Sequence, residues 1–137
     1  MNYWLVKSEP VKYAWAQLVK DGKTFWSGVR NYQAANNLKA MKKGDQVFFY
    51  HSNEGLEIVG ICEIAKEYYP DHTDESGKFG MVDVKPVRPL KTPVTLTAIK
   101  AEPALADIAL IRQSRLSVMP ITPQQWKQIC KMGGIKP

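Results

Sequence analysis

Three consecutive segments in the middle of the chain most constrain what it can fold into. They are "GDQVFFYHS", "EGLEIVGICEIAKEYY" and "GMVDVKPVRPL", and the turn-forming runs "SNEG" and "DHTDESGK" separate them. Segments rich in β-branched and aromatic residues between such turns are typical of an antiparallel meander. Because the first two segments are apolar on both faces, we expect the sheet to curl into a small barrel or to be covered by helices.

The flanking segments predict a further strand and several helices. The run "NYWLV" predicts a strand over residues 2–6, and the segment after it predicts a helix over about 11–20. We expect a second helix from a cap near Asn31, two short helical pieces broken at Pro103, and a final helix capped by Thr122. The chain is therefore expected to adopt an α+β fold.

Near the C-terminus, "RQSRLSVMPI" alternates between apolar and polar residues. Leu116 and Val118 are expected to face the core. Arg115, Ser117 and Met119 are expected to form a polar wall on the other side.

The length and charge of the chain narrow the classes of protein to which it can belong. A chain of 137 residues without internal repeats or linkers predicts a single domain over residues 1–137. The excess of 19 Lys and Arg over 13 Asp and Glu gives a net charge of +6, which attracts a polyanion without specifying one. No apolar run is long enough to cross a membrane, so we expect a cytoplasmic protein with no membrane partner.

Few marks of catalysis are present. Cys62 and Cys130 lack a Cys-x-x-Cys neighbour, and the chain has no G-x-S-x-G, phosphate-binding glycine-rich or His-Glu-x-x-His motif. We therefore predict no catalytic residue, no cofactor and no metal. His51 stands beside Ser52, but adjacent residues on a strand point to opposite faces and cannot easily pair. His51 is interpreted as a structural or pocket-lining residue.

The segment "FWSGVRN" places an aromatic side chain among uncharged and basic groups. An unstacked nucleobase needs an aromatic face and hydrogen-bond partners for its edge, and basic residues then hold the phosphates. Trp26 is a candidate for stacking, Ser27 and Asn31 for the base edge, and Lys7 and Arg30 for phosphate. The alternatives are that Trp26 belongs to the core and that Asn31 only caps its helix.

Four motifs occur in the order "YWLVKSEP", "FWSGVRNYQAANNLKAMKKGDQVFFYHS", "EIVGICEI" and "RQSRLSVMPIT". Together they resemble the EVE domain, a member of the PUA-like superfamily that is related to YTH domains. The resemblance implies a pseudo-barrel, that is, a small antiparallel β-barrel with flanking helices. EVE domains are associated with modified cytosines in DNA, and YTH domains read N6-methyladenine in RNA. The implied partner is therefore DNA or RNA that carries a modified base.

The resemblance also implies which residues form the site. The carboxylate of Glu9 suits the exocyclic amine of cytosine, although a place in the first turn of a helix explains it equally well. A second cage tryptophan is not assignable, so Tyr50, Tyr68 or Phe79 is expected to complete an aromatic cage. The predicted base-binding residues are Trp26, Ser27, Asn31, Ser8, Glu9, His51, Ser52 and Ser117, and the predicted phosphate-binding residues are Lys7, Arg30 and Arg115.

These observations predict a non-catalytic module that acts as a monomer and accepts a flipped, modified base. Two alternatives stay open. One is a protein that handles a small molecule or nucleoside, including an enzyme with Glu9 or His51 as its base. The other is an RNA-binding module that is indifferent to modification.

Overall fold

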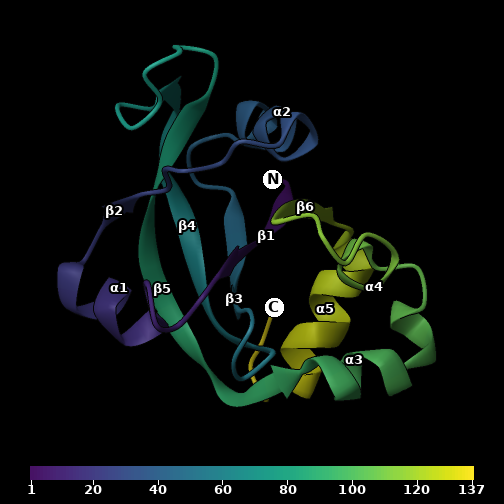
Figure 1. The fold of residues 1–137 in the computed structure, drawn as a ribbon. Helices are drawn as coiled ribbons and strands as arrows, with labels where there is room; N and C mark the ends of the chain where they lie inside the picture. The colour runs from purple at the N-terminus through teal and green to yellow at the C-terminus, as the bar shows by residue number, and fades with distance from the viewer.

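The computed structural model describes residues 1–137, and its centre is a six-stranded sheet surrounded by helices (Figure 1). The strand order is β2-β5-β4-β3-β1-β6, and every neighbouring pair is antiparallel except β1 with β3. The strands are β1 (Tyr3–Ser8), β2 (Thr24–Phe25), β3 (Gln46–His51), β4 (Glu57–Pro70), β5 (Gly80–Thr95) and β6 (Val118–Ile121).

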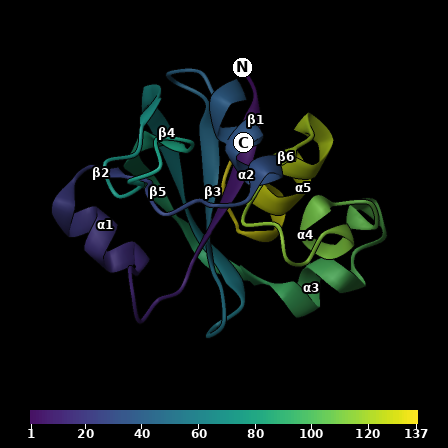
Figure 2. The same cartoon turned by 45° about the horizontal axis from the view of Figure 1, so that its top comes forward.

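The helices lie on two sides of this sheet. Figures 1 and 2 both show α1 beside the β2–β5 edge, with α3, α4 and α5 grouped on the side of β1 and β6. None of them combines the length and apolar character that a bilayer-spanning segment requires. The helices are α1 (Trp15–Asp21), α2 (Tyr32–Ala40), α3 (Leu96–Ala101), the 3₁₀ helix η1 (Pro103–Leu105), α4 (Ala109–Arg112) and α5 (Pro123–Met132).

The predicted antiparallel meander is confirmed as β3, β4 and β5. Register shifts along the β4–β5 pair add local bends, which a long two-stranded ribbon needs in order to curve around a core. The edge strands β2 and β6 do not pair with each other, so the sheet is not closed. The predicted α+β architecture with flanking helices is confirmed, and the helices pack against the open sheet, mainly on β4, β5 and β6.

The first helix begins later than predicted. Instead of spanning 11–20 it starts at Trp15, and β1 runs on to Ser8. The Ser8 hydroxyl donates to the Tyr13 carbonyl at 2.6 Å, while the amides of Lys12 and Tyr13 both donate to the Glu9 carbonyl. These bonds hold the chain in a turn at the end of β1, so the polar residues there remain beside the sheet.

The predicted polar wall near the C-terminus is wrong at one position. Met119 and Val118 are fully buried, and Ile121 is nearly so. Strand β6 pairs with β1 and also packs against α2 and α4, so both of its faces are covered. Within the strand only Pro120 is exposed, and before the strand Arg115 reaches solvent.

The predicted caps are confirmed. Asn31 accepts a hydrogen bond from the Ala34 amide at 2.9 Å, and Thr122 forms a capping box with Gln125. The final helix turns Trp126 into the core, where its ring stacks on Phe48 at a centroid distance of 3.9 Å. One cluster of 32 buried residues joins the sheet to the helices.

Gly60 on β4 provides a test of how α1 packs against the sheet. A Cβ built at this glycine would lie 2.5 Å from Cζ2 of Trp15, the first residue of α1, because the indole covers the glycine directly. We expect Gly60→Ala to lower the free energy of unfolding by about 1–3 kcal/mol, the usual cost of overpacking. Chemical denaturation measures this value. The double variant Gly60→Ala/Trp15→Leu should lose less stability than the sum of the losses in the two single variants. If the two losses simply add, the contact between Trp15 and Gly60 is contradicted.

Candidate nucleic-acid interface

A cavity of about 770 Å³ opens where the end of β1 meets β2, the loop after β3 and the segment before β6. We call it the larger cavity. Its walls are mainly polar, and aromatic rings stand on one side. The larger cavity is lined by Lys7, Ser8, Glu9, Lys12, Tyr13, Thr24, Phe25, Trp26, Ser27, Gly28, Ser52, Asn53, Ser114, Arg115 and Ser117.

Trp26 is anchored on the wall of the larger cavity by a backbone hydrogen bond and a ring contact. Its amide donates to the Val82 carbonyl of β5 at 2.7 Å, which extends the pairing of β2. Its ring meets the buried Phe49 of β3 edge to face, with the centroids 5.6 Å apart. The side chain is only partly buried, so the remaining surface of the indole is available to a ligand.

Two cations stand in the larger cavity without an acidic partner. The Lys7 ammonium donates to the Ser114 carbonyl at 2.7 Å and lies 5.9 Å from the centre of the Tyr50 ring. Burial lowers the pKa of Lys7 from its usual value. Arg115 is exposed and makes no ion pair. Neither charge is neutralised by an ion pair within the chain, so both can attract an anionic ligand.

Glu9 contributes the one acidic side chain in the larger cavity. Its Oε2 forms an ion pair with Lys12 at 2.8 Å, and its Oε1 accepts a hydrogen bond from the Asn53 side chain. Each carboxylate oxygen can accept more than one hydrogen bond. Glu9 is thus oriented by two neighbours and still has capacity to accept from a ligand.

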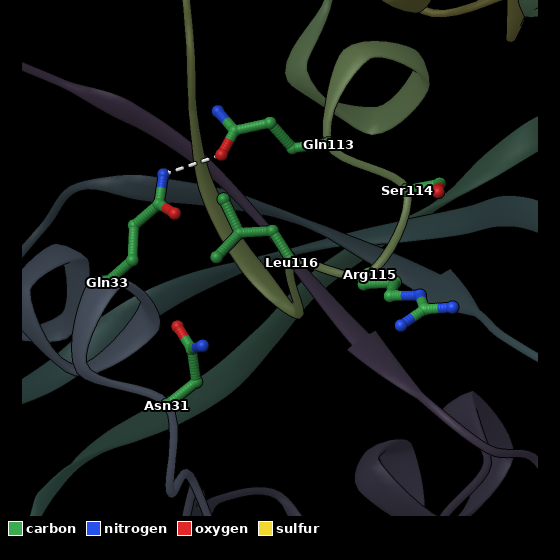
Figure 3. A pocket seen from close by; sticks show the side chains of 6 residues that line it. All are labelled: Asn31, Gln33, Gln113, Ser114, Arg115 and Leu116. Atoms are coloured by element: carbon green, nitrogen blue, oxygen red, sulfur yellow. Dashed lines mark hydrogen bonds between the residues drawn. The ribbon is translucent and has the colours of Figure 1, made fainter.

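The structure brings together eight of the eleven residues predicted for the site. These eight are Lys7, Ser8, Glu9, Trp26, Ser27, Ser52, Arg115 and Ser117. Asn31 lies instead on a neighbouring, smaller cavity (Figure 3). His51 and Arg30 line neither cavity.

His51 faces the start of α1. Its Nε2 accepts the Trp15 amide hydrogen at 3.1 Å, so this nitrogen is unprotonated. Burial lowers the pKa of His51, partly offset by the charge of Glu57. The ring therefore connects β3 to α1 in its neutral form.

Arg30 is bound to the tip of the β4–β5 hairpin. Its guanidinium donates to Asp71 Oδ2 at 3.1 Å and to the Thr73 hydroxyl at 2.9 Å. Asp71 Oδ2 also accepts the Gly28 amide hydrogen at 2.8 Å, and Gly28 has a φ of 82°, a backbone conformation that favours glycine. The buried Asp71 carboxylate therefore fastens the segment that follows Trp26 and Ser27.

The hydrogen bonds to Asp71 change its acidity. Burial alone would raise its pKa, but bonds from the Thr73 hydroxyl, the Gly28 and Thr73 amides and Arg30 outweigh burial. The result is a pKa lowered from 3.8 to about 2. The sequence pattern "DHTDESG" predicted only a turn here. The Asp-x-Thr spacing, which is typical of side-chain-capped turns, was the available signal for this contact.

The aromatic residues expected to complete a cage lie elsewhere. Tyr50 is buried beneath Lys7, and Phe79 packs on Tyr32 with ring centres 5.0 Å apart. Tyr68 covers Gly80 instead. The aromatic residues that join Trp26 in the larger cavity are Tyr13 and Phe25. Tyr13 lies inside the range predicted for the first helix, which starts only at Trp15, so the sequence pattern did not indicate its place in the cavity.

Fold and cavity together define an α+β protein with a basic, partly aromatic cavity. The EVE domain family matches residues 2–132, and the chain belongs to this family. This match confirms the resemblance seen in the four sequence motifs.

Relatives cover the chain almost completely. Thymocyte nuclear protein 1 of Gallus gallus is 38% identical over 98% of this chain and 70% of its own length. The structure of Rpa0253 from Rhodopseudomonas palustris is 60% identical with a TM-score of 0.93, covering 98% of this chain and 94% of that one. Human THYN1 in complex with DNA containing 5-methylcytosine is 34% identical with a TM-score of 0.92, covering 100% of both chains.

Asp71→Asn tests whether the hairpin tip positions the cavity wall. We expect the free energy of unfolding at pH 7 to fall by about 1–3 kcal/mol, because charge-assisted hydrogen bonds are lost. A carboxylate whose folded pKa is depressed stabilises the fold above its unfolded pKa. The wild-type protein should therefore lose this contribution as the pH falls from 3.8 towards 2, and Asp71→Asn should not. Urea titrations at a series of pH values measure both effects.

Asp74→Asn is the matched control. Asp74 lies in the same hairpin tip and accepts hydrogen bonds from Ser76, Lys78 and Phe79, but none from the cavity wall. Asp71→Asn should weaken ligand binding more than Asp74→Asn does. Equal losses of binding affinity would mean that the hairpin tip affects binding only through its own folding and does not position the cavity wall.

Proposed function

We propose that this chain is a DNA-binding module that takes a flipped, modified cytosine into the larger cavity. The observation that carries the proposal is the partly exposed Trp26 indole, held on a cavity wall beside free hydroxyls and unpaired cations. A base that leaves its stack loses aromatic contacts, and an indole face restores them.

The larger cavity offers suitable partners for the edge of a cytosine. The hydroxyls of Ser27, Ser52 and Ser117 are not engaged in hydrogen bonds within the chain, and a hydroxyl can both donate and accept. Glu9 is a proposed acceptor for the exocyclic amine, the group that distinguishes cytosine from thymine or uracil. Ser8 already donates to the Tyr13 carbonyl and retains its acceptor capacity.

The cations are proposed to hold the DNA backbone. Lys7 and Arg115 line the larger cavity without acidic partners. Arg30 is bound to Asp71, yet its side chain is 40% exposed, so its outer side can still contact a phosphate. Asn31 and His51 stand outside the larger cavity, and we propose that they support it, as a helix cap and as a link between β3 and α1.

The relatives support DNA and methylated cytosine as the ligand class. Human THYN1, similar over the full length of both chains, forms a complex with DNA that contains 5-methylcytosine. At 34% identity and a TM-score of 0.92 the two backbones are closely alike. This likeness, together with the polar and aromatic lining of the larger cavity, supports the same class of ligand for this chain.

We also propose that binding occurs without chemistry on the base. Of the two candidate general bases, His51 has its unprotonated nitrogen occupied by the Trp15 amide hydrogen. Glu9 is oriented by Lys12 and Asn53, and we propose that it only accepts a hydrogen bond from the nucleobase. No three His, Cys, Asp or Glu side chains lie close enough together to hold a metal ion. Chromatography of an oligonucleotide after incubation with the protein should return it unchanged, and a new product would favour the enzyme alternative.

Trp26→Ala tests the stacking role. Binding of a duplex that contains one 5-methylcytosine should weaken by about 1–3 kcal/mol, because the base loses its aromatic partner. Fluorescence anisotropy with labelled DNA measures the change, and thermal unfolding checks that the variant is folded. Tyr32→Ala is the control, since Tyr32 is 65% exposed and lines neither cavity. Equal affinities for Trp26→Ala and wild type would remove Trp26 from the site.

Salt dependence tests the phosphate contacts. Replacing Arg115 by alanine should reduce the slope of log affinity against log salt by about 0.9, the value for one phosphate contact on duplex DNA. Lys127→Ala removes the same charge from an exposed position on α5 that lines neither cavity, and it should leave the slope unchanged. A slope near zero for the wild-type protein would instead favour a free nucleoside as the ligand.

A further inference from the structure

We propose that the smaller cavity binds the nucleotide next to the modified cytosine, which makes recognition dependent on the flanking base. The inference rests on the proposed function. The smaller cavity has a volume of about 290 Å³, near the lower limit for ligand pockets and suited to one base rather than a larger ligand. It is lined by Asn31, Gln33, Gln113, Ser114, Arg115 and Leu116 (Figure 3).

The two cavities share one wall. Ser114 and Arg115 line both of them, and the Ser114 carbonyl is held by the Lys7 ammonium at 2.7 Å. Consecutive nucleotides are joined by a single phosphate. A base in each cavity would place that phosphate at the shared wall, where Lys7 and Arg115 carry positive charge.

Arg115 is suited to this bridging position. It forms none of the four ion pairs in the structure, whereas Arg30 and Arg112 are each paired with an aspartate. Figure 3 shows its side chain pointing away from the two glutamines, so the guanidinium does not fill the smaller cavity. The charge at the wall is therefore free for a phosphate while the space beside the amides remains open.

The smaller cavity carries neutral groups that can discriminate between bases. Gln33 Nε2 donates to Gln113 Oε1 at 2.7 Å, which joins α2 to the segment after α4, and each amide retains further donors or acceptors. The Asn31 Oδ1 accepts the Ala34 amide hydrogen at 2.9 Å, so its NH₂ group is free to donate. Side-chain amides pair with base edges, and Leu116 supplies an apolar surface for the base.

The lining also excludes other ligand classes. None of its six residues is acidic, so it offers no carboxylate to a metal ion or an amine and does not repel a phosphate. Its one apolar residue is too little surface for a lipid or a hydrophobic peptide. Amides beside a single free cation match a nucleotide.

The test uses a set of duplexes that each contain one 5-methylcytosine. In one series the base on its 5′ side is varied among the four bases, and in a second series the base on its 3′ side is varied in the same way. We expect the affinity of the wild-type protein to vary by at least about fivefold across one of the two positions, the lower end of what one base-edge pair contributes. Gln33→Ala/Gln113→Ala should reduce this variation to less than about twofold. Gln124→Ala, at an exposed glutamine of α5 outside both cavities, should preserve it.

The same duplexes made with unmodified cytosine separate the two proposals. If wild type prefers modified DNA but shows no flanking-base preference, or if the double glutamine variant keeps that preference, the second site is overturned and the proposed function stands. If wild type shows a flanking preference that the double variant loses but binds modified and unmodified DNA equally, the reading of the modification is overturned and the second site stands.

Discussion

The wall of the larger cavity depends on one buried carboxylate. Asp71, whose side chain is fully buried, accepts hydrogen bonds from the Gly28 amide, from Arg30 and from Thr73. It thereby connects the tip of the longest hairpin to the segment that carries the stacking candidate. A buried charge is tolerated only when it is fully paired, so the hairpin tip and the cavity wall must form together. The low pKa of Asp71 reflects this complete satisfaction.

A second contact closes the site from the opposite direction. Lys7, at the end of β1, donates to the carbonyl of Ser114, which belongs to the segment before β6. The end of β1, the wall containing Trp26 and the 114–117 segment thus surround one space, although they are far apart in the chain. Strand β1 pairs in parallel with β3 and antiparallel with β6. The last residues of β1 and β3 and the first residue of β6 therefore lie at the same end of the sheet.

Local signals predicted much of this structure correctly. Asn31 and Thr122 cap helices as expected, because a cap is decided by a side chain and an amide three residues away. The meander of β3, β4 and β5 followed from turn residues between apolar runs. The start of α1 was misplaced because the hydroxyl of Ser8 competes for a carbonyl, a contact that hydrophobic periodicity does not reveal. Met119 was misplaced because helices cover β6 from outside.

Local patterns in the chain were enough to predict the element types, the helix caps, the family and most of the polar residues that meet in the larger cavity. Tertiary structure decided which aromatic residues join Trp26, and it assigned Asn31 to a second cavity and Arg30 to a carboxylate at the hairpin tip. It also decided that the sheet stays open and is covered by helices. The physical reason is the range of the interactions. Caps and turns form between residues a few positions apart, whereas the Arg30–Asp71 pair spans 41 positions and the Lys7–Ser114 contact spans 107, so only the folded chain selects them.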